Sequence, residues 1–252
     1  MWDEGWMAAA AIVVFGLAGL VKGVVGLGLP TVSMALLAIF MPPAQAAGLL
    51  LMPSLVTNLA QLRPVAGLLP VLKRLGWMQL GIVLGTLGGM ALWGGVGSLP
   101  AARTALGLAL VVYALWGLCG PSLQVPLRHQ AWLGALCGLL TGGMTALTGV
   151  FVVPAVAFLQ SLGLARPALM QAMGLCFTTS TLALGVGLLW LGQGLGPQGE
   201  GSAAGLLASA LMLIPALAGM HWGELLRHKI SAIGFKKLLM LSLLGLGAYL
   251  CW

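Results

Sequence analysis

Charged residues are scarce in this sequence: Asp, Glu, Lys and Arg make up only 6% of its 252 residues. An ordinary soluble domain carries roughly a quarter, so a soluble globular domain is excluded. The four acids are Asp3, Glu4, Glu200 and Glu224, and all of them fall in predicted loops or at segment ends. No carboxylate is therefore expected inside the bilayer for a proton relay. These acids and three histidines cannot assemble a catalytic or metal-ligand set, which argues against an enzyme and a metal site.

Cysteine and nucleotide motifs are also missing. The four cysteines, Cys119, Cys137, Cys176 and Cys251, form no C-x-x-C pair, so they are interpreted as buried small hydrophobic residues. No phosphate-binding motif is present, so the chain is not itself an ATPase and no cofactor is expected. The 11 basic residues are scattered between apolar stretches and form no basic face, which excludes a nucleic-acid partner.

Long apolar runs fill most of the chain, which is 60% hydrophobic and has a mean hydropathy of +1.09. We predict an all-α, polytopic integral membrane protein with the lipid bilayer as its surroundings and about 8–10 transmembrane segments. The first is expected to be a retained helix, since the N-terminus lacks the basic region of a signal peptide. Ten candidate segments are found, at about 6–28, 29–41, 44–62, 75–95, 100–120, 130–148, 150–164, 167–191, 203–221 and 232–251.

Two of these segments, the second and the seventh, are near or below the roughly 17–20 residues that a straight crossing needs. Each is expected to be a half-helix or part of a broken helix. Lys and Arg in short loops stay in the cytoplasm. This rule places the loops at 63–74, 121–129 and 222–231, as well as Arg166, inside the cell. With all ten segments crossing, both termini face the periplasm.

The two halves of the chain, 1–124 and 125–252, resemble each other. Pro30, Pro43, Ser54 and Thr57 recur 124 positions later as Pro154, Pro167, Thr178 and Thr181, and Gly19-x-x-x-Gly23 recurs 119 positions later as Gly138-x-x-x-Gly142. Related halves with an odd number of crossings must insert with opposite polarity. The pattern therefore predicts the inverted repeats that secondary transporters use to alternate access to a midplane site.

The stretch 19–30 contains a cation, Lys22, among glycines and ahead of a proline. Gly and Pro loosen a helix, and backbone freed inside a membrane is tolerated where it lines protein or water. Lys22 is a candidate anion ligand, although a lysine near a helix end can also extend to the interface. The matching stretch 141–154 has threonines instead, and their hydroxyls can donate to an anion or bond to their own helix.

Polar residues also line the third segment of each half, either as interhelical contacts or as part of a shared site. The predicted substrate-binding residues are Lys22, Gly23, Gly26, Gly28, Ser54, Thr57, Asn58, Thr141, Gly142, Thr145, Thr148, Gln171, Thr178 and Thr179. A separate stripe of small residues, Gly81, Gly85 and Gly89, predicts tight packing of the fourth segment on a neighbouring helix.

The chain resembles the TauE/SafE (sulfite exporter, TSUP) permeases over nearly its whole length. The matching motifs are 19–28 closing on Pro30, Pro42-Pro43 before Gln45, 54–58, 142–154 and 171–178. The resemblance implies a permease of two related halves that moves sulfite, sulfoacetate, sulfonates or other small anions. The family's triple-glycine form is incomplete in both copies, which bears on the substrate more than on the fold.

The leading hypothesis is therefore a multi-pass permease of the bacterial inner membrane that exports a small anion. An interior-negative potential favours anion exit by roughly 2.3 kcal/mol per charge per 100 mV, so export needs no coupling ion. The alternatives are proton-coupled uptake of an organosulfonate or carboxylate, with His221 and Glu224 as the nearest candidates for proton coupling, and a non-transporting scaffold or assembly factor. The sequence leaves open whether the protein forms a homo-oligomer.

Overall fold

The protein is all helical over the residues that the computed structural model describes, which are 5–63, 65–120, 123–193, 202–227, 229 and 231–252. This confirms the predicted fold class. The helices are α1 (Gly5–Val25), α2 (Leu29–Leu37), α3 (Pro43–Gln61), α4 (Leu68–Trp93), α5 (Ala102–Cys119), α6 (Leu127–Thr148), α7 (Ala155–Gln160), α8 (Arg166–Trp190), α9 (Ser202–Leu226) and α10 (Ala232–Cys251), with a 3₁₀ turn η1 (Val65–Gly67) before α4.

The two short segments are broken, as the sequence predicts. Helix α2 has nine residues and α7 has six, so at about 1.5 Å per residue neither can cross a core of about 30 Å by itself. Each is preceded by non-helical backbone, at 26–28 and 149–154. Within the described residues, seven helices are long and apolar enough to span a membrane, namely α1, α4, α5, α6, α8, α9 and α10.

The short helices α2 and α7 end before the predicted segments do, whereas two long helices extend beyond their predicted ends. Helix α4 begins at Leu68 rather than near residue 75, so Lys73 and Arg74 lie in its first turns and not in a loop. Helix α9 continues to Leu226, beyond the predicted end at residue 221, so Glu224 lies in the helix and not in a loop. The reason for both extensions is that Lys, Arg and Glu are good helix formers, so a helix can continue into the polar interface after its apolar stretch has ended.

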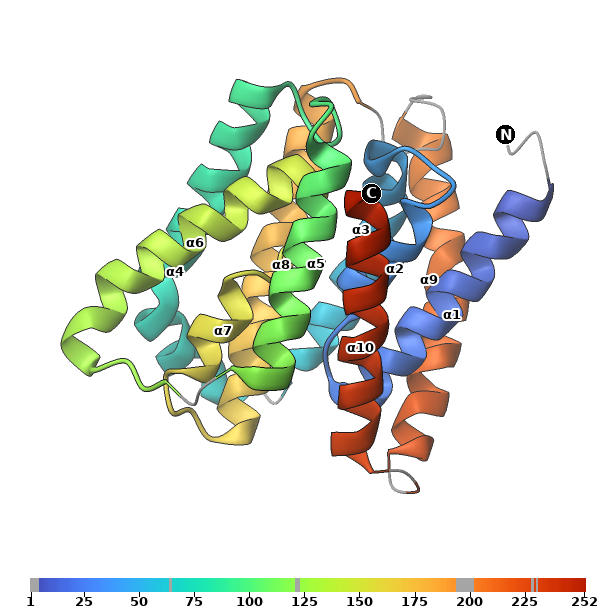
Figure 1. Cartoon of the computed structure of the whole chain (residues 1–252). Helices are drawn as coiled ribbons and strands as arrows, with labels where there is room; N and C mark the ends of the chain where they lie inside the picture. Colours follow the sequence, from blue (N-terminus) through green and yellow to red (C-terminus); the bar gives the residue numbers. More distant parts are fainter. Residues whose placement is uncertain (1–4, 64, 121–122, 194–201, 228, 230) are drawn as a thin grey trace.

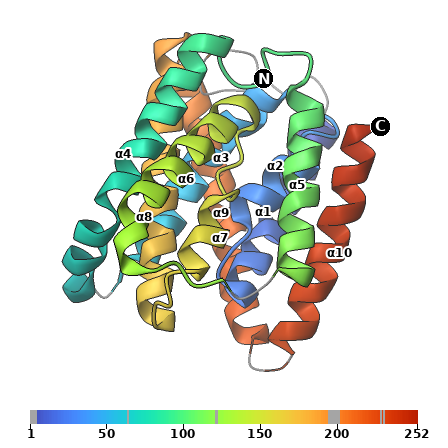
Figure 2. The same cartoon turned by 60° about the vertical axis from the view of Figure 1, so that its left-hand side comes forward.

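The helices pack in matching pairs. Helix α1 lies against α9 as α6 lies against α4, and α3 contacts α9 as α8 contacts α4. The remaining principal contacts, α3 with α8 and α5 with α10, join elements at the same position in the two halves. Figures 1 and 2 show that α1, α3 and α5 run in the opposite direction to α6, α8 and α10. This is the arrangement that two inverted halves would produce.

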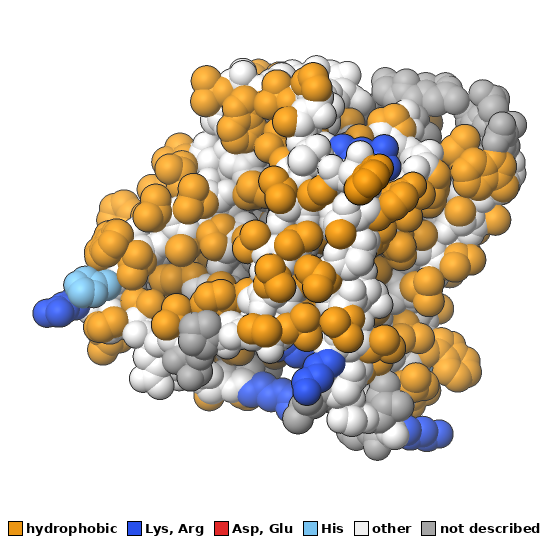
Figure 3. Space-filling view, in the orientation of Figure 1, with side chains coloured by type: hydrophobic (Ala, Val, Ile, Leu, Met, Phe, Trp, Pro, Cys, Tyr) orange, Lys and Arg blue, Asp and Glu red, His pale blue; other side chains and the backbone are white. Residues whose placement is uncertain are grey.

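Basic residues and exposed apolar residues occupy different parts of the surface. The start of α1 and the end of α10 lie at the upper end of Figure 1, whereas Lys and Arg gather mainly toward the lower end in Figure 3. Apolar side chains cover the region between, and residues such as Leu84, Leu136, Val186 and Leu241 are about half exposed. We call the lower end the basic end. That this end faces the cytoplasm stays a prediction.

Glycines bring the paired helices into backbone contact. A Cβ on Gly81 or Gly85 would lie 2.4 Å from the carbonyl oxygen of Ala135 or 2.2 Å from that of Leu139. The predicted tight packing of this stripe, here between α4 and α6, is confirmed. Helices α1 and α9 meet in the same way, because a Cβ on Gly19 would lie 2.1 Å from the Ala216 carbonyl oxygen. Small residues allow this close approach in lipid.

Candidate functional site

Lys22 is buried near the basic end of the helix bundle. Its side chain is 3% exposed in the last turn of α1. The ammonium Nζ donates to Thr57 Oγ1 at 3.0 Å and to Asn58 Oδ1, both on α3. Lys22 therefore does not extend to the interface, and its partners are neutral oxygens. Of the four acids, only Glu224 lies in the described residues, and it is exposed.

Two further polar groups on the same face of α3 have no partner. Asn58 Nδ2 and Ser54 Oγ are buried without a hydrogen bond, and Ser54 lies one helical turn before Asn58. Buried polar groups are normally paired. Thr57 is satisfied, since it accepts from Lys22 and donates to the Pro53 carbonyl at 2.6 Å. A positive charge thus lies beside open donors, which is the chemistry that an anion requires.

The glycine break after α1 is hydrogen-bonded to α3, the helix that carries Thr57 and Asn58. Gly26 and Gly28 have φ of 84° and 110°, which only glycine adopts readily, and they end α1 and open α2. Gln61 Nε2 donates to the Gly26 carbonyl at 2.7 Å, so the end of α3 holds the loosened backbone. Gly28 is the N-cap of α2. A polar residue of the third segment therefore contacts the glycine break.

The matching stretch of the second half uses its hydroxyls within its own helix. Thr141, Thr145 and Thr148 each donate to the carbonyl four residues earlier at 2.7 Å. Thr178 does the same to Gly174 in α8 at 2.7 Å. These side chains follow the local bonding that the sequence left as an alternative. These side chains are buried, but each hydroxyl already donates its hydrogen to a carbonyl oxygen of its own helix.

The remaining predicted residues have different surroundings. Gly23 and Gly142 face neighbouring helices, because a Cβ there would lie 2.2 Å from the Met220 carbonyl oxygen or 2.4 Å from that of Ile82. Their need for glycine is explained by helix packing. Gln171 donates to the Leu62 carbonyl at 3.4 Å and so joins α8 to the end of α3. Thr179 is half-buried on α8.

Other buried hydroxyls were not among the predicted substrate-binding residues. Thr31 and Ser33 on α2, Thr86 on α4 and Ser180 on α8 carry a side-chain oxygen that has no partner. All four are completely buried. The polar residues of the short helix α2 could have been found from their place directly after the Gly-Pro break. Thr86 carries no such signal, because a single threonine in an apolar helix is common.

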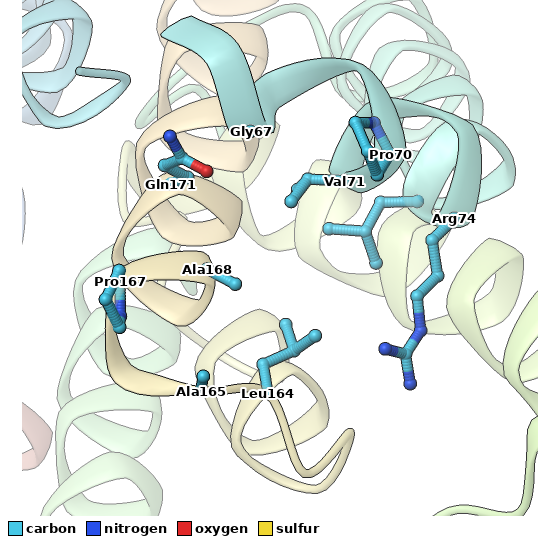
Figure 4. Close-up of a pocket in the computed structure, with 10 residues that line it drawn as sticks. Gly67, Pro70, Val71, Arg74, Leu164, Ala165, Pro167, Ala168 and Gln171 are labelled. Atoms are coloured by element: carbon cyan, nitrogen blue, oxygen red, sulfur yellow. The ribbon is translucent and has the colours of Figure 1, made fainter. Parts of the chain in front are cut away.

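A cavity of about 420 Å³ opens between the start of α4 and the start of α8. Figure 4 shows Arg74 and Gln171 on its opposite sides, with Val71, Leu164 and Ala168 between them. Arg74 is held in place, since its Nε donates to Gln130 Oε1 at 2.8 Å. The cavity lies at the basic end and reaches α8 one turn before Gly174, which packs on the Asn58 carbonyl. Through Gly174 and Gln171, α8 thus connects this cavity with the end of α3 that carries Asn58.

A comparison with protein families gives one match. The family described as "Sulfite exporter TauE/SafE" matches residues 11–250. No curated protein and no solved structure matches the chain. The matched region includes every helix apart from the first residues of α1 and the last residue of α10. The chain therefore belongs to the TauE/SafE family, whose members are multi-pass membrane transporters and generally not enzymes.

Proposed function

We propose that this protein carries small anions, of the sulfite or organosulfonate type, out of the cytoplasm across the bacterial inner membrane, and that Lys22 binds the anion. The observation that carries the proposal is the buried Lys22 ammonium, held by Thr57 and Asn58 beside donors without partners. The sequence resemblance to sulfite exporters and the family match support the same class of substrate.

Electrostatics supports an anion rather than a cation or a neutral solute. Removing an ammonium from water costs several kcal/mol even after the protein relaxes. Thr57 and Asn58 offset part of this cost through hydrogen bonds, but they bring no negative charge. A bound anion would supply that charge, and Asn58 Nδ2 and Ser54 Oγ could donate to its remaining oxygens. Sulfite and sulfonates offer three such oxygens on one sulfur atom.

The position of the site supports export. Lys22 lies in the last turn of α1, which is at the same end of the bundle as the end of α3 and the starts of α4 and α8. These helix ends carry Arg63, Arg74 and Arg166. By the positive-inside rule this end faces the cytoplasm. The cavity between α4 and α8 would then be the route by which an anion reaches the site. The membrane potential would drive one negative charge outward with roughly 2.3 kcal/mol per 100 mV.

The test is counterflow of labelled sulfite, sulfoacetate and taurine in proteoliposomes, with Lys22→Met as the variant and Lys73→Met as its matched control. Lys73 is an exposed lysine of α4 at the same end. Hydrogen bonds to charged groups contribute about 1.5–3 kcal/mol, so Lys22→Met should reduce anion counterflow by about 10- to 150-fold. Lys73→Met should leave it unchanged.

The yield of folded protein is the second measurement. Lys22→Met should be recovered in detergent at the wild-type yield or better, because it removes an uncompensated buried charge. Wild-type counterflow by Lys22→Met, at all substrate concentrations, would contradict the proposal. Absence of counterflow by the wild-type protein for every anion tried would favour the scaffold alternative.

A further inference from the structure

A second cation lies in a polar cavity away from the Lys22 site. Lys236, in the first turns of α10, is half-buried and lines a cavity of about 310 Å³ at the basic end. The cavity lies where the end of α5, the end of α7 and the start of α10 meet. Its other polar side chains are Gln124, Gln160 and Ser161, and none of its described lining residues is acidic.

An apolar cavity adjoins this polar one. It has a volume of about 190 Å³ and is lined by Val112, Tyr113 and residues 152–154, together with two residues that also line the polar cavity. The shared residues are Trp116 and Ala157. Val112 lies one helical turn before Trp116 on α5, which runs toward the basic end, so the apolar cavity lies deeper in the bilayer. The pair therefore changes from polar to apolar along the direction of the membrane normal.

The two helices that border this pair of cavities, α5 and α10, expose apolar side chains, as expected of helices next to lipid. Val112 and Leu115 on α5 are 53% and 48% exposed, and Leu238 and Leu241 on α10 are 62% and 56% exposed. Trp116 supplies an indole at the junction, and Trp is enriched where a membrane changes from headgroups to acyl chains. A free inorganic anion would use only the polar part of such a site.

We propose that this pair of cavities binds one anionic phospholipid of the inner leaflet. The phosphate would lie at the Lys236 ammonium within reach of the Gln124 and Gln160 amides, and an acyl chain would enter the apolar cavity past Ala157. Basic pockets between transmembrane helices on the cytoplasmic side suit anionic headgroups. Since Val152 and Pro154 belong to the broken stretch between α6 and α7, the lipid would contact the part of the second half that corresponds to the Lys22 break.

Lipid binding to the purified, delipidated full chain tests the proposal. Phosphatidylglycerol should bind and raise the melting temperature more than phosphatidylcholine with the same acyl chains. Lys236→Gln should weaken phosphatidylglycerol binding about fivefold, the effect of one lysine near an anionic surface. Lys237→Gln is the matched control, because its exposed neighbouring side chain does not line the cavity. Lys236→Arg should keep most of the binding.

A second measurement locates the acyl chain. Phosphatidylglycerol brominated on its acyl chains should quench the tryptophan fluorescence of the wild-type protein more than that of Trp116→Phe. Ala157→Leu should reduce this difference, because the larger side chain fills the junction without changing charge. Equal losses in Lys236→Gln and Lys237→Gln would show that surface charge alone attracts the lipid. Inorganic phosphate that displaces the lipid at equal concentration would show a free-anion site. Either result would overturn the proposal.

Discussion

The Lys22 cluster and its counterpart in the second half use one scaffold for different chemistry. By the repeat offsets, Lys22 corresponds to Thr141 and Thr57 corresponds to Thr181. Thr141 and Thr181 donate to their own helix carbonyls at 2.7 Å, whereas Lys22 donates across to α3. Asn58 corresponds to Leu182, which is 52% exposed. The first half thus has a charged site where the second half is neutral.

The packing around the two regions is nearly the same. Gly19 of α1 and Gly138 of α6 both face a carbonyl oxygen of the partner helix, at 2.1 Å and 2.2 Å from a built Cβ. The comparison teaches that symmetry is retained where helices must approach closely and is lost where the side chains carry chemistry. Because the halves run in opposite directions, one charged site lies nearer to one membrane face, and the proposed transporter would be functionally asymmetric.

The largest effect is expected from Asn58→Asp. This change keeps the shape of the side chain but places a carboxylate beside Lys22, where it would pair with the ammonium and repel the substrate. Like-charge contacts cost several kcal/mol, so anion counterflow should fall by about 100-fold or more. Asn58→Leu, which copies the second half, separates the two effects, because it removes the amide without adding charge. A smaller loss with Asp than with Leu would contradict an anion site.

Gly85→Leu tests the part of the comparison that concerns packing. A Cβ there would lie 2.2 Å from the Leu139 carbonyl oxygen, so α4 and α6 must separate. The expected loss of stability is about 3 kcal/mol or more, seen as a lower yield and melting temperature in detergent. Gly88→Leu is the matched control on the same helix, with no atom within 4 Å of the built Cβ. Similar yields for both variants would show that the stripe tolerates separation.

Lys22→Arg should have a moderate effect. The charge is kept, but a planar fork replaces a compact ammonium in a buried position between α1 and α3. We expect about tenfold weaker apparent affinity with residual transport, measured as the concentration dependence of counterflow. A complete loss equal to that of Lys22→Met would show that geometry matters as much as charge, and wild-type affinity would argue against direct contact with the anion.

Thr141→Val should have the smallest effect. The hydroxyl bonds within its own helix, so its removal should change counterflow by less than about twofold and stability by no more than about 1 kcal/mol. Counterflow and the melting temperature of this variant test whether the threonines of the second half take part in transport. A loss comparable to that of Lys22→Met would show that the threonine leaves its carbonyl to contact substrate, and the two regions would then act as one site.

The sequence predicted much of this architecture because membrane insertion depends on composition and periodicity. Apolar length identified the long helices, and two short runs identified the broken segments now seen as α2 and α7. The glycine stripe of α4 predicted that this helix packs tightly on a neighbour, since only small residues permit such contacts in lipid. The start of α4 was misplaced, because Lys73 and Arg74 look like a loop in sequence but extend the helix.

Only the tertiary structure decided which polar residues meet. Sequence alone selected Lys22 and the threonines of 141–148 for the same reason, a polar residue beside a glycine break. Folding brings Lys22 to Asn58, 36 positions away, and leaves the threonines bonded to their own helix. The physical reason is reach: a threonine hydroxyl lies close to its own preceding turn and bonds there, whereas a lysine ammonium stands several bonds from its backbone and finds its partners on another helix.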